Sequence, residues 1–232
     1  PSDAVPWIET DPTSAIMIKY ASNAFLAARV SMINEIAAVC GEVGANTDDV
    51  VAGMGYDPRI TPNYLSPGAG FGGPCLEKDL KTLLTFTSGN SLDLLLLRSV
   101  LERNDQQIRG LVDDLEGYMG GSLSGKTVTI YGLAFKAHTN DIRDSVSLKA
   151  VDILKDKGAR IRAYDPVIQN GLRPELTCFS DPYEAVAGSH GLMVLTGWPE
   201  LVDLDYARVK RLMADPVIVD GRNCLDAAAW RA

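Results

Sequence analysis

The spacing of apolar residues changes at the glycine pair Gly120-Gly121, and this change constrains the fold more than any other feature of the sequence. Before the pair, residues 11–119 show mostly helical spacing, with one long connection rich in glycine and proline over residues 56–73. After it, short apolar runs alternate with helical stretches. Such alternation predicts right-handed crossovers and a parallel sheet covered by helices on both faces. We therefore expect a chain of the α/β class, with an all-helical domain over residues 1–119 and a parallel-sheet domain over residues 120–232.

The expected elements follow from these patterns and from the residues that begin and end them. In the first part, helices are predicted over residues 12–40, 47–55, 76–87 and 91–119. In the second part, strands are predicted over residues 127–131, 160–164, 176–179, 191–195 and 217–219, with helices over 145–158, 182–187 and 206–213 between them. Ligands bind such sheets at the carboxyl ends of the strands, which here lead into residues 132–136, 165–166 and 220–223.

Composition argues against several classes of function. The 232 residues carry a net charge of −8, which disfavours a nucleic-acid partner, because nucleic-acid phosphates need a basic surface. No run of about 18 apolar residues occurs, so we expect no membrane span and a cytoplasmic location. The cysteines at positions 40, 75, 178 and 224 form no C-x-x-C pair, and the two histidines have no cluster of metal-binding residues around them. We therefore expect reduced thiols and no metal site.

Cys75 is the strongest candidate for chemistry. It follows the glycine-rich run Gly70-Phe71-Gly72-Gly73 and precedes the helix predicted from Leu76. A thiol at a helix N-terminus, with Lys78 three residues later, lies in a positive field that favours the reactive thiolate. Asp79 is expected one turn along the same face, so a nucleophile and a carboxylate could together support covalent catalysis followed by hydrolysis. Taken alone, however, a buried cysteine without a chemical role is the commoner case.

The glycines from Gly68 to Gly73 also fit the pattern G-x-G-x-x-G of dinucleotide-binding proteins. The preceding residues 61–67 contain two prolines, however, and proline is not found in a central strand. No strand–helix–strand unit surrounds the motif. We therefore interpret it as a loop whose glycines let the backbone approach a ligand closely in front of Cys75.

Several further segments occur together in an order and spacing that resembles one enzyme family. Lys19 and Asn23 lie four residues apart on the first predicted helix, where an ammonium group and an amide could stabilise negative charge on an oxygen. The other segments are Asn34-Glu35, Arg59-Ile60, the run from Gly70 to Asp79, Gly132-Leu133-Ala134-Phe135-Lys136, Thr139-x-Asp141-Ile142-Arg143-x-Ser145 and Tyr164-Asp165-Pro166. In these segments the chain resembles the UDP-glucose/GDP-mannose dehydrogenase family over nearly its whole length. The resemblance implies a central, dimerisation-type helical domain followed by a Rossmann-like domain that binds a nucleotide sugar.

The resemblance also implies a reaction and a role for each site residue. The enzyme would be NAD-dependent and would oxidise the C6 alcohol of a nucleotide sugar to a carboxylate, as in the conversion of UDP-glucose to UDP-glucuronate. Cys75 would form a thiohemiacetal and then a thioester, Lys19 and Asn23 would hold the oxyanion, and Asp79 would orient or deprotonate water. Substrate contacts would come from Arg59, Tyr64, Leu65, Gly68, Gly70, Phe71, Gly72, Phe135, Lys136 and Arg222. Lys78 and Arg143 would face the NAD cofactor.

Some implications concern groups outside this sequence. Arg59 is expected to reach the active site of a neighbouring subunit, in a homodimer formed through the central helices. The family's N-terminal NAD-binding domain is missing from the sequence, so we expect the chain alone not to transfer hydride. Two departures from the family's pattern are Ile16, where relatives usually have glutamate, and Pro74, which replaces a small polar residue.

Two other functions are open on the sequence. The chain could be a catalytically incomplete module that binds a nucleotide sugar and dimerises. It could also belong to a sugar-acid or hydroxyacyl dehydrogenase with a similar helical middle domain. The second alternative explains less, because such an enzyme has no need for the pair Cys75 and Asp79 or for a second α/β domain.

Overall fold

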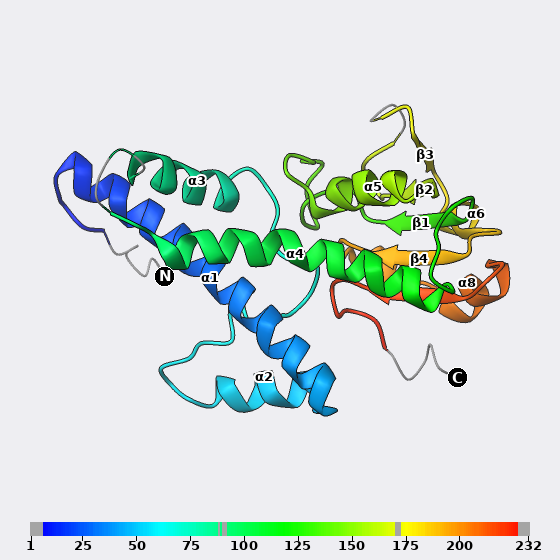
Figure 1. The fold of residues 1–232 in the computed structure, drawn as a ribbon, viewed down its shortest axis with the longest axis horizontal. Helices are drawn as coiled ribbons and strands as arrows, with labels where there is room; N and C mark the ends of the chain where they lie inside the picture. The colour runs from blue at the N-terminus through cyan, green and yellow to red at the C-terminus, as the bar shows by residue number, and fades with distance from the viewer. Residues whose placement is uncertain (1–6, 88, 90–91, 170–172, 227–232) are drawn as a thin grey trace, which may run out of the picture.

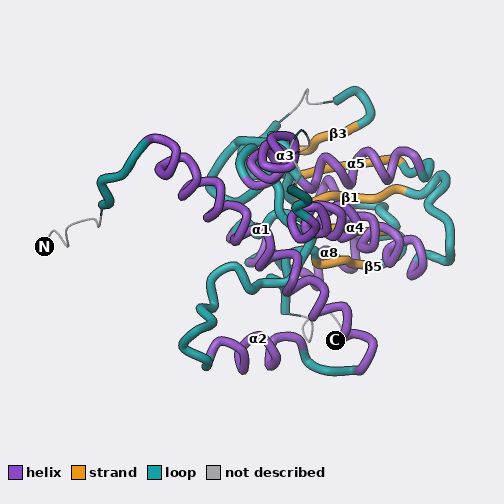
Figure 2. Tube along the Cα trace, turned by 60° about the vertical axis from the view of Figure 1, so that its left-hand side comes forward, coloured by secondary structure: helices purple, strands orange, loops and turns teal. Residues whose placement is uncertain are grey.

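The structure is a computed structural model that describes residues 7–87, 89, 92–169 and 173–226. Figure 1 shows helices α1 (Pro12–Val43), α2 (Thr47–Gly55) and α3 (Leu76–Thr87) on one side and the strands on the other, with α4 (Leu95–Tyr118) running across both parts. Figure 2 shows that α2 follows the C-terminal end of α1 and lies away from the strands.

The ends of the first helix show why local sequence predicts it well. Asp11 caps α1 by accepting a hydrogen bond from the backbone N–H of Ser14 at 3.0 Å, and Pro12 occupies the first turn, where no N–H is needed. At the other end Gly44 adopts a left-handed conformation with φ of 74°, which stops the helix. Both signals lie in the sequence next to the helix that they delimit.

The second part is a five-stranded parallel sheet with the order β3-β2-β1-β4-β5. Its strands are β1 (Thr127–Tyr131), β2 (Arg160–Tyr164), β3 (Leu176–Phe179), β4 (Gly191–Val194) and β5 (Val217–Asp220). The connecting helices are α5 (Val146–Asp156), α6 (Pro182–Val186), α7 (Pro199–Val202) and α8 (Tyr206–Leu212). Helices α4 and α5 pack together over β5 and β2, whereas α6 packs on β1, β2 and β3 and against α8. The predicted α/β class, helical part and parallel sheet are confirmed.

Differences from the sequence-based expectation are small and have local causes. The last long helix begins at Leu95 rather than near residue 91, and the predicted start at Ser91 lies outside the described residues. Helix α7 was not expected, because four residues are too few for a helical period to show. Strand β4 ends one residue earlier than predicted, and β5 ends one residue later.

Helix α4 belongs to two hydrophobic cores. Its residue Val100 packs in a small core with Ala24, Ala27, Phe71 and Leu80. Further along the same helix, the buried side chains belong to the large core of the sheet; these are Ile108, Val112 and Leu115. The apolar pattern changes at Gly120-Gly121, but the two cores divide earlier, within α4.

Among the described helices, α1 alone is long and apolar enough to cross a membrane, by length and composition only. The sequence had not suggested this, because a helix can be apolar on average without an unbroken apolar run. In the structure 33% of the most apolar stretch is buried, and the helix packs against α3 and α4. A core helix passes the same test, so the indication of a membrane span is weak.

Candidate functional site

A cavity of about 590 Å³ lies between the helical part and the carboxyl ends of the strands. Its wall includes Asn23 from α1, the loop that leads to Cys75, and residues that follow β1 and β5. The predicted site residues that line it are Asn23, Tyr64, Gly68, Gly70, Phe71, Gly72, Cys75, Phe135, Lys136 and Arg222. Residues more than 190 positions apart in the sequence, such as Asn23 and Arg222, therefore share one chamber.

Cys75 is exposed at the N-terminus of α3, where its carbonyl oxygen accepts a hydrogen bond from the N–H of Asp79 at 2.9 Å. Two cations lie near it. The pKa of Lys78 is raised chiefly by its hydrogen bond to Asp79, and that of Arg143 chiefly by Asp141, with a smaller contribution from Cys75 in both cases. The thiol is therefore open to the cavity and close to positive charge, as a nucleophilic cysteine requires.

Asp79 lies beneath the cavity wall with 0% of its side chain exposed. Its Oδ2 accepts a hydrogen bond from Asn23 Nδ2 at 2.6 Å and lies 3.4 Å from Lys19 Nζ, while its Oδ1 pairs with Lys78. Burial raises the pKa of Asp79, but the hydrogen bonds from Lys78 and Asn23 and the nearby charges outweigh burial and hold the pKa below its ordinary value. The carboxylate is therefore a weak base, and its contacts orient Lys19 and Asn23.

Arg222 brings a partly unsatisfied guanidinium group to the opposite wall. Its Nε donates to the carbonyl oxygen of Leu195 at 2.6 Å, and its Nη1 lies 3.4 Å from the carbonyl oxygen of Gly70. Among the described residues, Nη2 is buried and has no hydrogen-bond partner. Burial lowers the pKa of Arg222, because a charged group loses hydration there. Arg222 lines the cavity, and a cationic group with an unpaired donor in a cavity wall is suited to an anionic ligand.

The glycine loop departs from the interpretation drawn from the sequence. A Cβ atom on Gly70 would lie 2.5 Å from Oδ1 of Asn104, and one on Gly72 would lie 2.6 Å from the carbonyl oxygen of Asp144. A Cβ on Gly73 would meet the ring of Phe135 at 2.6 Å. A side chain at these positions would collide with other parts of the protein. Close packing of the loop against the protein, rather than room for a ligand, therefore explains the glycines. The loop still presents backbone atoms to the cavity.

Other predicted residues lie outside this cavity. Leu65 is buried and lines a second cavity of about 540 Å³ between α1, α2 and α4, because the loop turns its side chain away from Cys75. Arg59 lines the second cavity too, with 86% of its side chain exposed, and pairs with Asp57 at 2.6 Å. Lys78 and Arg143 are exposed and do not line the first cavity.

Two lining residues on α1 were missed by reasoning from the sequence. Leu26 and Val30 lie three and seven residues after Asn23 on α1 and line the same cavity. Helical spacing from Asn23 places all three on one face, so this periodicity could have identified them. They supply an apolar wall beside the polar groups.

The turn from β1 to α5 is where a parallel sheet would hold the phosphates of a dinucleotide. Here Ser145 caps α5 by accepting from the N–H of Ser147 at 3.2 Å, and the N–H of Gly73 donates to the carbonyl oxygen of Asp144 at 3.2 Å. The cysteine loop thus covers the entrance to the helix. These residues do not fit a dinucleotide at this turn. Within the described residues, no three histidine, cysteine, aspartate or glutamate side chains are grouped to hold a metal ion.

Comparison with known proteins adds relatives that share both parts of the chain. The chain is similar to the UDP-glucose 6-dehydrogenase TuaD of Bacillus subtilis, with 40% identity. The match covers 98% of this chain and 50% of TuaD. A UDP-glucose 6-dehydrogenase of Rhizobium meliloti is 38% identical over 94% of the chain and 51% of its own length. The chain therefore spans about half the length of the curated relatives that it matches.

Solved structures show the same relationship. A UDP-glucose dehydrogenase from Pyrobaculum islandicum superposes with a TM-score of 0.88 at 32% identity, over 98% of this chain and 52% of that one. A UDP-D-ManNAc dehydrogenase from Pyrococcus horikoshii superposes with a TM-score of 0.81 at 27% identity, over 94% and 50% of the two chains.

The family's own domains match almost the whole sequence. Residues 13–106 match the central domain of the UDP-glucose/GDP-mannose dehydrogenase family, and residues 129–227 match its UDP binding domain. These two matches contain the cysteine loop and the residues after β1 and β5, and they follow the order of the helical and sheet parts seen in the structure. The chain belongs to the UDP-glucose/GDP-mannose dehydrogenase family, as its central and UDP-binding domains.

Proposed function

We propose that this chain carries the nucleophile and the substrate site of an NAD-dependent nucleotide-sugar 6-dehydrogenase that converts UDP-glucose to UDP-glucuronate. The observation that supports the proposal most strongly is the single cavity lined by Cys75, Asn23 and Arg222, whose buried Nη2 has no hydrogen-bond partner among the described residues. A nucleotide sugar has a diphosphate at one end of the sugar and a reacting carbon at the other. A chamber with an anion-binding donor on one wall and a thiol on another matches that chemistry.

The sheet side of the cavity would bind the diphosphate and nucleotide. Arg222 would donate its free Nη2 to a phosphate oxygen, and Lys136, whose Nζ lies 5.4 Å from the centre of the Phe135 ring, would add a second cation. The backbone of the loop from Tyr64 to Gly72 would complete the cradle. Local cations explain how a chain with a net charge of −8 would hold an anion.

The helical side would carry out the chemistry on C6. The C6 alcohol would first lose a proton and a hydride, the hydride to one NAD, to give the aldehyde. The thiolate of Cys75 would then add to the carbonyl carbon of the aldehyde to give a thiohemiacetal, and loss of a second hydride from that carbon to a second NAD would leave a thioester. Water would then add to the thioester and release the carboxylate and the thiol. Lys19 and Asn23 would stabilise the oxyanion of these steps. Asp79, whose side chain is 0% exposed and contacts both groups, would orient Lys19 and Asn23.

The hydride acceptor would be NAD bound mainly by a part of the protein outside this chain. Lys78 and Arg143 are the cations that this chain offers beside Cys75, with 55% and 70% of their side chains exposed. We therefore expect them to contact the cofactor, and we expect the chain alone not to transfer hydride. Four free cysteines accord with a cytoplasmic location, which we also propose.

Besides the nucleotide sugar, we propose a second copy of this chain as a partner, in a homodimer formed through α1. Ile18, Phe25, Met32 and Val39 recur every seven residues on α1 and are 50%, 65%, 61% and 58% exposed. This spacing places them in one apolar stripe along the helix, and such a stripe is typical of a surface that another helix covers. Phe25 and Met32 also line the second cavity together with Arg59. If a second copy of the chain covers the stripe, Arg59 of one copy would lie close to the active site of the other copy.

A catalytically incomplete binding and dimerisation module is the alternative. It would need the cavity and the stripe but would have no use for a reactive thiol. The exposed position of Cys75 near Lys78 and Arg143 favours the enzyme.

Ligand binding tests the proposal directly. UDP-glucose should raise the melting temperature by about 5–10 °C at a concentration of about 100 Kd, and GDP-mannose should raise it less. Arg222→Met should weaken UDP-glucose binding by about 10- to 100-fold, because a charge-assisted hydrogen bond is lost. Arg208→Met, on α8 with its guanidinium over the Tyr183 ring, is the matched control and should bind normally. No shift with any nucleotide sugar would refute the proposed substrate class.

A further inference from the structure

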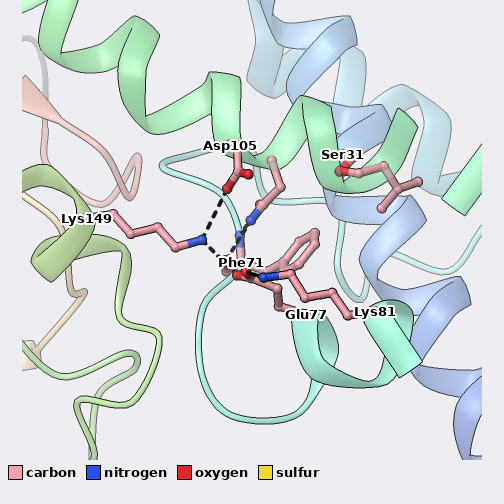
Figure 3. Close-up of polar contacts among 8 residues, drawn as sticks. Ser31, Phe71, Glu77, Lys81, Asp105 and Lys149 are labelled. Atoms are coloured by element: carbon pink, nitrogen blue, oxygen red, sulfur yellow. Dashed lines mark hydrogen bonds and ion pairs between the residues drawn. The ribbon is translucent and has the colours of Figure 1, made fainter. Parts of the chain in front are cut away.

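The segment from Phe71 to Glu77 carries Cys75. At Phe71, its first residue, this segment is held by Asn104 of α4. The side chain of Asn104 is 4% exposed, and its Oδ1 accepts from the N–H of Phe71 at 2.8 Å while its Nδ2 donates to the carbonyl oxygen of Phe71 at 3.0 Å. The two bonds hold the backbone of Phe71 in the manner of a neighbouring strand. Figure 3 shows Phe71 among the polar side chains of this region.

Two residues after Cys75, the segment is fixed again by Glu77. Glu77 is 9% exposed; its Oε2 accepts from Lys149 Nζ of α5 at 2.7 Å, and its Oε1 accepts from Lys81 Nζ at 2.6 Å. Lys149 also bonds Asp105 of α4 at 3.2 Å (Figure 3). Three helices thus meet at the first turn of α3. Burial raises the pKa of Glu77, but Lys149 and Lys81 outweigh it and lower the pKa, so the carboxylate is charged.

Between these two anchors the N–H of Gly73 donates to the carbonyl oxygen of Asp144 at 3.2 Å, so the segment is also held by the turn before α5. Gly73 has φ of 86°, and glycine loses more backbone freedom on folding than other residues. A buried ion pair is a poor source of stability, because desolvation offsets most of the attraction. What such a pair supplies is a fixed geometry, and the geometry fixed here is that of Cys75.

We propose that Glu77 and Lys149 are positioning residues for Cys75: they hold the first turn of α3 against α5 and thereby keep the thiol in the wall of the cavity beside Asn23 and Lys136. The inference rests on the proposed function, in which Cys75 is the nucleophile.

A positioning role and a purely electrostatic role predict opposite changes in the reactivity of Cys75 for one of two variants, Glu77→Gln. Lys149→Met removes a positive charge near the thiol, and Glu77→Gln removes a negative one. If charge alone mattered, alkylation of Cys75 would slow in the first variant and quicken in the second, because a nearby positive charge favours the thiolate. If the pair positions Cys75, both variants loosen the first turn of α3, and alkylation of Cys75 slows in both.

The experiment measures alkylation of each cysteine by iodoacetamide, followed by mass spectrometry, between about pH 5 and about pH 10. In the unchanged chain Cys75 should be alkylated faster than the buried Cys40. Lys149→Met and Glu77→Gln should each slow alkylation of Cys75 near neutral pH by about 3- to 10-fold, because the loosened turn no longer holds the thiol beside the positive charges that favour its thiolate. Lys149→Arg, which keeps the charge and the donors, should restore the original profile.

Lys157→Met is the matched control. Lys157 at the other end of α5 also joins α5 to two carboxylates of α4, at 2.6 Å to Glu116 and 3.0 Å to Asp113, but far along the helix from Cys75. The Lys157→Met variant should lose about as much stability in urea unfolding as Lys149→Met, and its Cys75 alkylation profile should be unchanged. Opposite changes in the rate of Cys75 alkylation in Lys149→Met and Glu77→Gln, or no change in either, would overturn the positioning role while leaving Cys75 reactive. Alkylation of Cys75 no faster than that of the buried Cys40 in the unchanged chain would refute the proposed function, and the positioning role with it.

Discussion

At the scale of single residues, the site is organised around one buried carboxylate. Asp79 is in contact with Lys19, Asn23 and Lys78 at once, so three groups from two helices take their positions from it. Cys75 is one turn away along the same helix. The identity of these residues could be predicted from the sequence, but the central place of Asp79 could not, because it depends on how α1 packs against α3.

Replacing the nucleophile should separate binding from chemistry. In a protein that joins this chain to an NAD-binding domain of the family, Cys75→Ser should bind UDP-glucose normally, because the hydroxyl has a similar size and polarity. Formation of the carboxylate should fall by at least about 1000-fold, since the thioester cannot form. Calorimetry of binding and a measurement of NAD reduction would check this. Cys178→Ser on β3 is the control, and equal turnover by Cys75→Ser would remove the thioester from the mechanism.

Acid should destabilise the region around Cys75 through two carboxylates. The pKa values of Asp79 and Glu77 both lie below their ordinary values of 3.8 and 4.5, so folding favours the charged forms. Their contribution is complete above those ordinary values and is lost as the pH falls through the lowered ones. Urea midpoints measured from neutral to acidic pH should therefore fall less steeply for Asp79→Asn than for the unchanged chain. Asp114→Asn, an exposed position of α4, should not alter the slope; parallel curves for all three proteins would contradict the prediction.

At the scale of elements, the cysteine loop is shaped by its contacts with α4 and with the turn into α5. The sequence predicted the bounds of β1, β2 and β3 to the residue and placed α2 and α3 closely, because caps and apolar runs are local signals. It did not predict the direction of the loop between α2 and α3. Leu65 and Gly70 were both assigned to the substrate, but only Gly70 lines the cavity with Cys75, whereas Leu65 lines the second cavity. Such orientations are set by distant residues that no local pattern reveals.

A methyl group at Gly70 should test how tightly this loop is packed. Gly70 has φ of 92°, and its Cβ would lie 2.5 Å from Asn104 Oδ1, so Gly70→Ala combines backbone strain with a clash. We expect a loss of about 2–5 kcal/mol in the free energy of unfolding, measured by urea denaturation. Gly110→Ala, within α4 where nothing lies within 4 Å, should instead stabilise the chain by about 0.5–1 kcal/mol. Equal effects of the two substitutions would show that the loop is free to move.

At the scale of the whole molecule, the apolar stripe on α1 stays exposed to solvent in a single chain. Its members Phe25 and Met32 are more than half exposed, which is costly for a helix that stays uncovered in water. The sequence showed excess apolar residues on this helix. It could not separate those that pack in the core from those that form the stripe, because the separation requires the positions of α3 and α4.

A charge in the stripe should separate the two copies. Met32→Lys should change the molar mass in solution, measured by light scattering with size exclusion, from that of a dimer to that of a monomer, because two lysines would meet near the contact. Since Met32 is 61% exposed in the single chain, the melting temperature of the monomeric variant should fall only through loss of association. Val167→Lys, a partly exposed apolar position in the sheet part, should remain dimeric. A monomeric unchanged chain would refute the proposed dimer.

Helix α4 has a consequence for how the protein melts. Because one continuous helix contributes side chains to both cores, neither half can lose its structure without withdrawing apolar contacts from the other. Heating should therefore give a single cooperative transition, and the pieces obtained by severing the chain at Gly120-Gly121 should aggregate, since the sheet would lose the cover that Ile108, Val112 and Leu115 provide.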